Sequence, residues 1–235
     1  MSKQLQKRII TSLILFLSLL FFYFSNFFFI GLAVITLIIQ LEFNFMFQRI
    51  FGRTLKKGKT NFKSLFLSIL TIVYIIIAFD GSAILLHGVS GSPFFLLFIL
   101  SICFCSDIGG YVIGKSIGGK KLTSISPNKT ISGSIGSFFF SILPLVIFNY
   151  FDQYEYSYIF NNFLLCLIIS LVCQAGDLFI SYIKRKAKIK DTGAFLPGHG
   201  GILDRLDGVI FAIPFSYFYL NGFQEFYNQL KIFFL

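Results

Sequence analysis

Residues 181–207, SYIKRKAKIKDTGAFLPGHGGILDRLD, form the one long polar stretch in a chain that is otherwise largely apolar. This stretch, called here the polar segment, contains six Lys or Arg, three Asp, one His and four Gly between two hydrophobic segments. Charged side chains close to membrane spans are costly and usually mark function. Carboxylates, cations and glycines in this combination suit the binding of a polyphosphate and its metal ions.

The composition predicts an integral membrane protein. The chain is 56% hydrophobic and 13% charged, with 34 Phe among 235 residues and a mean hydropathy of +0.81. A water-soluble domain of this size has too little interior to bury that much apolar surface. Because lipid offers no partner to unpaired backbone groups, we expect an all-α polytopic helical bundle. One continuous membrane domain is expected, with N-terminal spans in residues 1–100 and a catalytic part in residues 101–235.

Hydropathy predicts about seven transmembrane helices, since roughly 20 apolar residues cross the hydrocarbon core. The predicted spans are residues 9–24, 27–47, 64–80, 93–114, 137–151, 158–183 and 208–221. The first span follows three cations, as in a signal peptide, but no small-residue cleavage site follows it, which favours an uncleaved anchor. Residues 222–235 are expected at the outer interface.

The basic residues predict the orientation of these spans. With seven spans, all of the 20 Lys and Arg except Lys231 fall on one side of the membrane. The positive-inside rule places that side in the cytoplasm. The predicted location is the cell (inner) membrane, with the polar segment cytoplasmic and the C-terminus outside. The net charge of +10 then reflects membrane topology rather than binding to nucleic acid.

Three aspartates in and beside the polar segment are the first candidates for chemistry. On a helix, Asp177, Ser181 and Lys184 share a face. Asp204 and Asp207 are three residues apart and are predicted to share a face at the start of the last span. Hard cations such as Mg²⁺ bind one or two carboxylates together with substrate phosphates, so these three aspartates are predicted metal ligands. The alternative for Asp177 is a salt bridge to a lysine on a neighbouring helix.

The glycines of the polar segment predict close approach to an anion. Residues 197–201 read Pro-Gly-His-Gly-Gly, and backbone N–H groups beside glycine can come near a phosphate. A plain re-entrant turn is the alternative interpretation of this loop.

Another group of candidates lies at the end of the fourth span, beginning with Asp107. Residues 109–116 satisfy the pattern GxxxxGK[ST], but that motif works between a strand and a helix, which is not predicted here. Gly110, Gly114 and Gly118 instead have the spacing that lets membrane helices touch. The following run Ser126–Thr130 is polar and cationic, and is a candidate phosphate-contacting loop.

The polar segment resembles the phosphatidate cytidylyltransferase family, also called CDP-diacylglycerol synthases. The resemblance rests on residues 181–207, SxxKRxxxxKDxGxxxPGHGGxxDRxD, and two weaker pieces agree with it, residues 174–178 and 107–130. Residues 1–100 are similar only as generic membrane spans. Three positions depart from the family pattern: Ile180 and Ser132 stand where acidic residues are usual, and Gly208 stands where Ser is common.

The resemblance implies the reaction of CTP with phosphatidate to give CDP-diacylglycerol and pyrophosphate, with Mg²⁺ as cofactor and a second metal ion left open. It implies that Asp177, Asp204 and Asp207 are catalytic, with Asp107 as a further candidate. His199 is expected to contact a CTP phosphate or to protonate the departing pyrophosphate, unless it only shapes the turn. The implied substrate-binding residues are Ser126, Lys129, Thr130, Ser181, Lys184, Arg185, Lys190, Asp191, Gly198, Gly200, Gly201 and Arg205.

Other functions stay open from the sequence. A CTP-dependent polyprenol or lipid kinase shares the membrane setting and the triphosphate chemistry, and a divergent member without catalysis is compatible with the departures. A transporter is disfavoured, because the charged residues gather at one face of the membrane. A CDP-alcohol phosphotransferase is disfavoured, because its aspartate motif is not found. The implied partners are CTP, phosphatidate and the lipid bilayer, with a homodimer also open.

Overall fold

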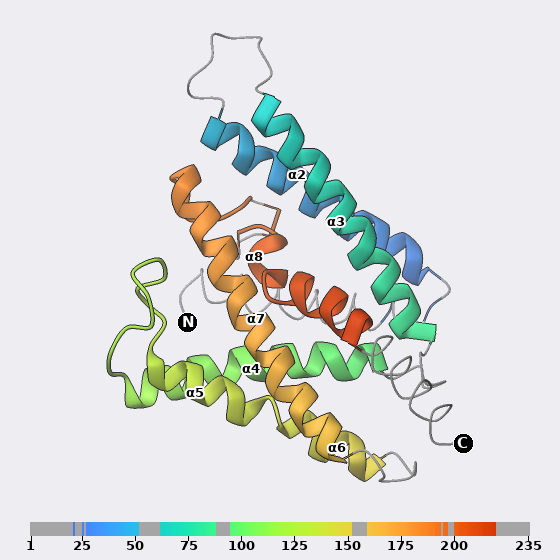
Figure 1. The fold of residues 1–235 in the computed structure, drawn as a ribbon, viewed down its shortest axis with the longest axis vertical. Helices are drawn as coiled ribbons and strands as arrows, with labels where there is room; N and C mark the ends of the chain where they lie inside the picture. The colour runs from blue at the N-terminus through green and yellow to red at the C-terminus, as the bar shows by residue number, and fades with distance from the viewer. Residues whose placement is uncertain are drawn as a thin grey trace, which may run out of the picture. The chain divides into compact units, whose positions relative to one another are not determined.

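The computed structural model describes residues 21, 25, 27–51, 62–87, 95–151, 159–193, 195–196 and 200–219. Within these residues the regular structure is α-helical, with two isolated β-bridges and no strand (Figure 1). The predicted all-α class is therefore confirmed. The helices are α2 (Phe28–Phe51), α3 (Phe62–His87), α4 (Phe95–Ile117), α5 (Ile131–Phe140), α6 (Leu143–Phe151), α7 (Ile159–Ala187) and α8 (Leu203–Leu206), followed by a helix over Val209–Tyr219.

Five segments of the described chain are long and apolar enough to cross a membrane. They are Phe28–Phe51, Phe62–Ala83, Phe95–Ile117, Ile131–Tyr150 and Asn162–Ala187. The helix Val209–Tyr219 is apolar but shorter. The predicted first span, apart from Phe21, and the terminal segment 222–235 lie outside the described residues. A polytopic membrane bundle is thus confirmed, while the count of seven spans stays a prediction.

The predicted span 137–151 begins earlier than expected and is broken in the middle. Thr130 caps the N-terminus of α5, because its Oγ1 accepts a hydrogen bond of 3.1 Å from the N–H of Gly133. Ser141 caps the other end of α5, and α6 starts at Leu143. Pro144 occupies the first turn of α6, where a missing N–H costs little. The small residues before position 137, expected in a loop, therefore belong to a helix.

The described chain divides into two compact units, and each is described by itself. One unit contains the described residues up to Phe79 together with Tyr182–Leu206. The other contains Asp80–Ser181 and the described residues from Asp207 onward. The predicted division of one membrane domain near residue 100 stays a prediction.

In the first unit, α2 and α3 run antiparallel and side by side (Figure 1). The side chain of Gln40 donates a hydrogen bond of 3.2 Å to the carbonyl of Ser68, and the rings of Phe29 and Phe79 pack 6.5 Å apart. The buried side chains of α2 repeat every three or four residues and so form one face of the helix. They belong to Ile39, Glu42, Phe43, Met46 and Phe47, which places one carboxylate in an apolar stripe.

In the second unit, α4 and α5 lie in close contact through glycines. A Cβ added at Gly136 would lie 2.5 Å from Cβ of Ile113 and 2.8 Å from the carbonyl oxygen of Gly109. Gly110 and Gly114 face α5 in the same way, so their predicted role in helix contact is confirmed. Glycine is required at these positions because any larger side chain would push the two helices apart.

Gly118 does not share this packing role, and the prediction for it is wrong. Gly118 follows the end of α4 with a φ of +65°, and a Cβ there would meet nothing within 4 Å. Its conformation favours glycine because it lies in the left-handed region. Residues 109–116 lie entirely within the continuous helix α4, so the GxxxxGK[ST] pattern is not a P-loop.

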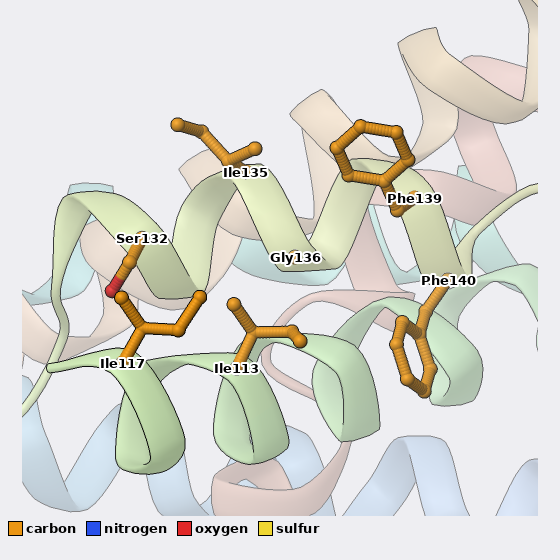
Figure 2. Close-up of a pocket in the computed structure, with 7 residues that line it drawn as sticks. All are labelled: Ile113, Ile117, Ser132, Ile135, Gly136, Phe139 and Phe140. Carbon is orange, nitrogen blue, oxygen red and sulfur yellow. The ribbon is translucent and has the colours of Figure 1, made fainter.

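An apolar groove lies along the contact between α4 and α5 (Figure 2). Ile113 and Ile117 of α4 form one wall, and the α5 side chains of Ile135, Phe139 and Phe140 lie along the other. The groove has a volume of about 310 Å³, and its polar lining residue is Ser132. The groove is a surface suited to hydrocarbon chains, as expected for helices in lipid.

Candidate functional site

The polar segment leaves α7 through a tight left-handed turn. The N–H of Ile189 donates to the carbonyl of Lys184 (3.0 Å), and the N–H of Lys188 donates to the carbonyl of Arg185 (3.1 Å). These two bonds form a Schellman motif, in which the left-handed position is usually glycine. Lys188 occupies it with a φ of +57°. The helix is thereby stopped within four residues of Lys184, the first lysine of the polar segment.

The carboxylate of Asp204 accepts hydrogen bonds from both ends of the loop in the polar segment. Its Oδ1 accepts a hydrogen bond of 2.8 Å from Nζ of Lys184. Its Oδ2 accepts from the N–H of Thr192 (2.7 Å), from the hydroxyl of Thr192 (3.0 Å) and from the N–H of Gly201 (2.9 Å). The Asp204 side chain is only 8% exposed. This carboxylate therefore joins α7, the start of the loop and α8.

The surroundings of Asp204 favour its charged form. Burial disfavours the carboxylate, but the hydrogen bonds from Lys184, Gly201 and Thr192 and the charge of Lys184 outweigh burial and lower the pKa of Asp204 below its usual value. Asp204 is thus ionised at neutral pH and forms a charged clamp on the loop.

A second carboxylate, Glu42 of α2, lies inside the same loop and was not among the predicted site residues. Glu42 is 2% exposed. Its oxygens accept hydrogen bonds from the hydroxyl of Thr192 (2.7 Å) and from the N–H groups of Ile202 and Leu203 (2.9 Å each). The available signal was a lone acidic residue in a predicted apolar span, which is as costly as the one at Asp177.

Gly200 and Gly201 shape the loop around these two carboxylates. Gly200 has a φ of +87°, and a Cβ there would lie 2.9 Å from Oδ2 of Asp204. A Cβ at Gly201 would lie 2.5 Å from both oxygens of Glu42. The N–H of Gly200 donates to the carbonyl of Leu196 (3.2 Å) and that of Gly201 to Asp204. Both predicted anion-binding N–H groups are therefore engaged within the protein.

The remaining predicted residues of the polar segment lie at its surface or outside the described part. Four side chains are exposed, those of Arg185, Lys190, Asp191 and Arg205. Pro197, Gly198 and His199 lie outside the described residues. The exposed cations give this part of the first unit a positive surface, which favours anionic ligands.

The second unit carries another carboxylate–lysine group. Asp177 of α7 forms an ion pair with Lys129, which lies just before α5. The hydroxyl of Ser181 lies 3.4 Å from Oδ1 of Asp177, one turn along the same helix. Asp107 of α4 interacts electrostatically with both Asp177 and Lys129. The predicted alternative for Asp177, a salt bridge to a lysine, is therefore present, and it brings a second carboxylate with it.

The turn before α5 holds Lys129 in place. The N–H of Lys129 donates to the carbonyl of Ser126 (3.1 Å), and the N–H of Ser126 lies 3.3 Å from Oγ1 of Thr123. Ser132, at one of the positions where an acid is usual in the resembled family, shares a hydrogen bond of 3.0 Å with Thr130. Ile180, at the other such position, is fully buried. Neither of these two side chains supplies a carboxylate.

Asp204 and Asp207 do not lie on one continuous helix, contrary to expectation. The helix α8 contains only Leu203–Leu206, and a turn at Asp207 and Gly208 precedes the helix Val209–Tyr219. Oδ1 of Asp207 accepts a hydrogen bond of 3.0 Å from the N–H of Gly208. The two aspartates belong to different compact units. Glycine at 208 favours this break, because it weakens a helix.

Within the described residues, no group of three or more His, Cys, Asp or Glu side chains could hold a metal ion. A site with fewer protein ligands is still compatible with Mg²⁺, which usually keeps waters and binds substrate phosphates. Asp107 and Asp177 are two carboxylates of the same unit. Lys129 provides positive charge beside that pair in the structure.

Both charged groups combine carboxylates with lysines that can meet a phosphate. The fold and these groups define an all-α integral membrane protein with polar clusters suited to an anionic ligand. The model of the cytidylyltransferase family matches residues 2–223, nearly the whole chain, and the protein therefore belongs to that family.

Curated relatives agree with this family membership. The phosphatidate cytidylyltransferase of Bacillus subtilis (strain 168) is 40% identical over 131 residues, which cover 55% of this chain and 48% of the relative. That of a Synechocystis species is 42% identical over 117 residues, covering 50% and 40%. That of Rickettsia bellii is 39% identical over 133 residues, covering 54% and 57%. The matched part of the chain spans about half the length of these relatives.

Proposed function

We propose that the protein is a nucleotidyltransferase that converts CTP and phosphatidate to CDP-diacylglycerol and pyrophosphate. An oxygen of the phosphatidate phosphate attacks the α-phosphorus of CTP, and the bond from that phosphorus to the β-phosphate oxygen breaks, releasing pyrophosphate. The lipid phosphate is itself the nucleophile, so a Ser, Cys or His nucleophile is not needed. The relatives named phosphatidate cytidylyltransferase support this choice of substrates.

One structural observation carries the proposal most directly. The polar segment, on which the resemblance rests, is an ordered cluster in its described part, with Asp204 holding Lys184, Thr192 and Gly201. A plain surface loop does not require a charged clamp with four donors. The family model, which covers these residues, supports the same chemistry.

The cations of each unit offer partners to the negatively charged substrates in this proposal. Lys129 and Lys184 each pair with an aspartate, and a phosphate oxygen can take the place of either carboxylate at the lysine. Exposed Arg185, Lys190 and Arg205 add positive charge for the triphosphate. His199 and Gly198 stay proposed contacts to CTP, with proton donation to pyrophosphate as the further role of His199.

Asp177 is the leading proposed ligand for Mg²⁺, with Asp107 beside it and Asp207 as a further ligand. When bound, Mg²⁺ would polarise phosphate oxygens and offset the charge of the departing pyrophosphate. Asp204 remains a candidate ligand from the sequence, but its four hydrogen bonds support a role in shaping the loop. Gly200 and Gly201 are proposed to shape the same loop.

The proposed location is the bacterial inner membrane, with the active site on the cytoplasmic side. CTP is a cytoplasmic nucleotide, and the basic connections, which the predicted spans place on one side of the membrane, are expected to face the cytoplasm. The bacterial relatives support this setting.

The test is CTP-dependent formation of CDP-diacylglycerol in membranes that contain the expressed protein. With CTP labelled at the α-phosphate, label should enter the lipid, and with CTP labelled at the γ-phosphate it should not. Entry of γ-label into lipid would instead support the lipid kinase alternative. Incorporation of neither label, by protein shown to be inserted and folded, would support a non-catalytic member and reject the proposal.

A further inference from the structure

The buried carboxylate of Glu42 is used by no step proposed so far. It projects from the buried face of α2, and its partners are 150 to 161 residues away along the chain. A carboxylate in an apolar helix is costly, and such a residue is expected to have a task. Its partners are one hydroxyl and two backbone N–H groups, all in the stretch from Thr192 to Leu203.

The contacts of Glu42 fix both sides of the loop. On one side it accepts from the hydroxyl of Thr192, and on the other from the N–H groups of Ile202 and Leu203. Gly193 and Gly201 leave the space for it, since a Cβ at Gly193 would lie 2.7 Å from Oε1 of Glu42 and one at Gly201 would lie 2.5 Å from either oxygen. Residues on both sides of the loop thus surround this side chain.

Thr192 links Glu42 to Asp204. Its hydroxyl oxygen lies 2.7 Å from Oε2 of Glu42 and 3.0 Å from Oδ2 of Asp204. A hydroxyl has one hydrogen to donate, so it serves one carboxylate at a time, while the N–H of Thr192 donates to Asp204. The position of Asp204, and with it that of Lys184, depends on where Glu42 holds Thr192.

We propose that Glu42 is a positioning residue that holds the two described arms of the loop, residues 189–193 and 200–203, in the arrangement needed to bind the triphosphate of CTP. This inference rests on the proposed function, since it assigns the triphosphate to the polar segment. Glu42 itself does not touch the substrate. Its effect passes through Thr192, the N–H groups of Ile202 and Leu203, and Asp204.

The test compares Glu42→Gln with the wild type in two readouts. Gln keeps the volume but replaces one acceptor oxygen with a donor, so at least one of the three hydrogen bonds is lost. The KM for CTP should rise about tenfold or more, as expected for the loss of a hydrogen bond to a charged group. The KM for phosphatidate should stay within about twofold of the wild-type value, because the loop is assigned to CTP and the contacts to phosphatidate are unchanged. A merely structural role would lower the amount of active protein and leave the KM for CTP unaltered.

The second readout follows the loop without any catalysis. In a background lacking the four native Cys, Phe195→Cys places a thiol at an exposed loop position, and Ser124→Cys places one at an exposed position in the other unit. Glu42→Gln should raise the labelling rate of the F195C thiol by a solvent-accessible maleimide, and leave the S124C thiol unchanged. If both thiols become more reactive, the substitution unfolds the protein generally and the positioning role is rejected.

Thr192 supplies a second pair of variants if Glu42→Gln does not insert. Thr192→Val removes the hydroxyl and should reproduce both effects, whereas Thr192→Ser keeps the hydroxyl and should stay close to the wild type. Unchanged CTP KM and unchanged F195C labelling in Glu42→Gln, or in Thr192→Val, would overturn the inference. A wild type that forms no CDP-diacylglycerol would overturn the proposed function and the link to CTP, and the labelling pair would still decide whether Glu42 holds the loop.

Discussion

Asp177 and Asp204 are both aspartates paired with a lysine, but their surroundings differ. Asp177 is 23% exposed and pairs with Lys129 beside Asp107. Asp204 is 8% exposed and its oxygens accept from Lys184 and from two backbone N–H groups. A metal-bound phosphate can reach the carboxylate of Asp177 by displacing fewer protein contacts than at Asp204. This difference supports the proposed roles of Asp177 as a metal ligand and of Asp204 as a loop clamp.

Replacing Asp177 with Asn should abolish most activity without preventing insertion. The substitution removes a charge at little change in volume, and a loss of about 10²-fold or more in turnover is expected if charge stabilisation dominates. The measurement is CDP-diacylglycerol formation at saturating Mg²⁺. Asp80→Asn, an exposed carboxylate of α3, is the matched control and should keep wild-type activity. Near-normal turnover of the Asp177→Asn protein would remove Asp177 from the proposed metal site.

The clamp at Asp204 should be insensitive to pH until strongly acidic conditions. The pKa of Asp204 is lowered in the folded protein, so the carboxylate stabilises the loop above its unfolded pKa of about 3.9 and loses that effect as pH falls through the lower folded value. Hydrogen exchange, corrected for intrinsic rates, should show constant protection of Thr192 and Gly201 from pH 7 to about 5. Asp204→Asn should lose this protection at every pH. Protection that already falls between pH 7 and 5 in the wild type would contradict the assignment.

At this scale the sequence predicted the charged groups but not their partners. Asp177, Lys129, Lys184 and Asp204 were predicted because they are polar residues close to motifs. Glu42 was missed because a single acid in an apolar span carries no local motif, and its partners are more than 140 residues away. The hydrogen bond from the N–H of Gly201 to Asp204 could not be predicted either, because glycine allows several loop shapes.

Among the elements, the end of α7 carries backbone strain that can be relieved. Lys188 has a φ of +57°, a conformation that costs a non-glycine residue roughly 1–2 kcal/mol. Lys188→Gly should therefore raise the free energy of unfolding by up to about 1 kcal/mol. The measurement is the midpoint of thermal unfolding in detergent, which should rise. Lys186→Gly is the control with the opposite sign, because glycine within the last helical turn should destabilise by about 1 kcal/mol. A lower midpoint for Lys188→Gly would show that the lysine side chain, rather than the backbone, matters there.

Helix positions were easier to predict than helix borders. Long apolar runs predicted α2, α3, α4 and α7, because a membrane leaves few alternatives to a helix. The start of α5 was missed because Ser and Gly near residue 133 usually indicate a loop, whereas here they allow contact with α4. The break between α8 and the helix Val209–Tyr219 was also missed, because the hydrophobic pattern continues past the turn at Gly208.

For the whole molecule, the proposed orientation predicts a labelling pattern. In the Cys-less background, Ser124→Cys and Lys188→Cys should react with a membrane-impermeant maleimide only after the cells are permeabilised. Ser90→Cys, in a connection expected on the opposite side, should react in intact cells. Strong labelling of K188C from outside intact cells would overturn the proposed topology and the cytoplasmic CTP site. The composition predicts the membrane class, but the joining of residues 182–206 to the α2–α3 unit depends on distant contacts that local patterns do not contain.

The distance along the chain between Glu42 and its partners has a consequence for biosynthesis. At 5–20 residues per second, a ribosome needs about 8 to 30 s to proceed from Glu42 to Thr192. During that interval the three donors that surround Glu42 in the finished protein have not yet been made. Newly made α2 therefore enters the bilayer before the hydrogen-bond donors to Glu42 have been synthesised. A nascent chain released before residue 192 would keep in its membrane helix a carboxylate without these three hydrogen-bond donors.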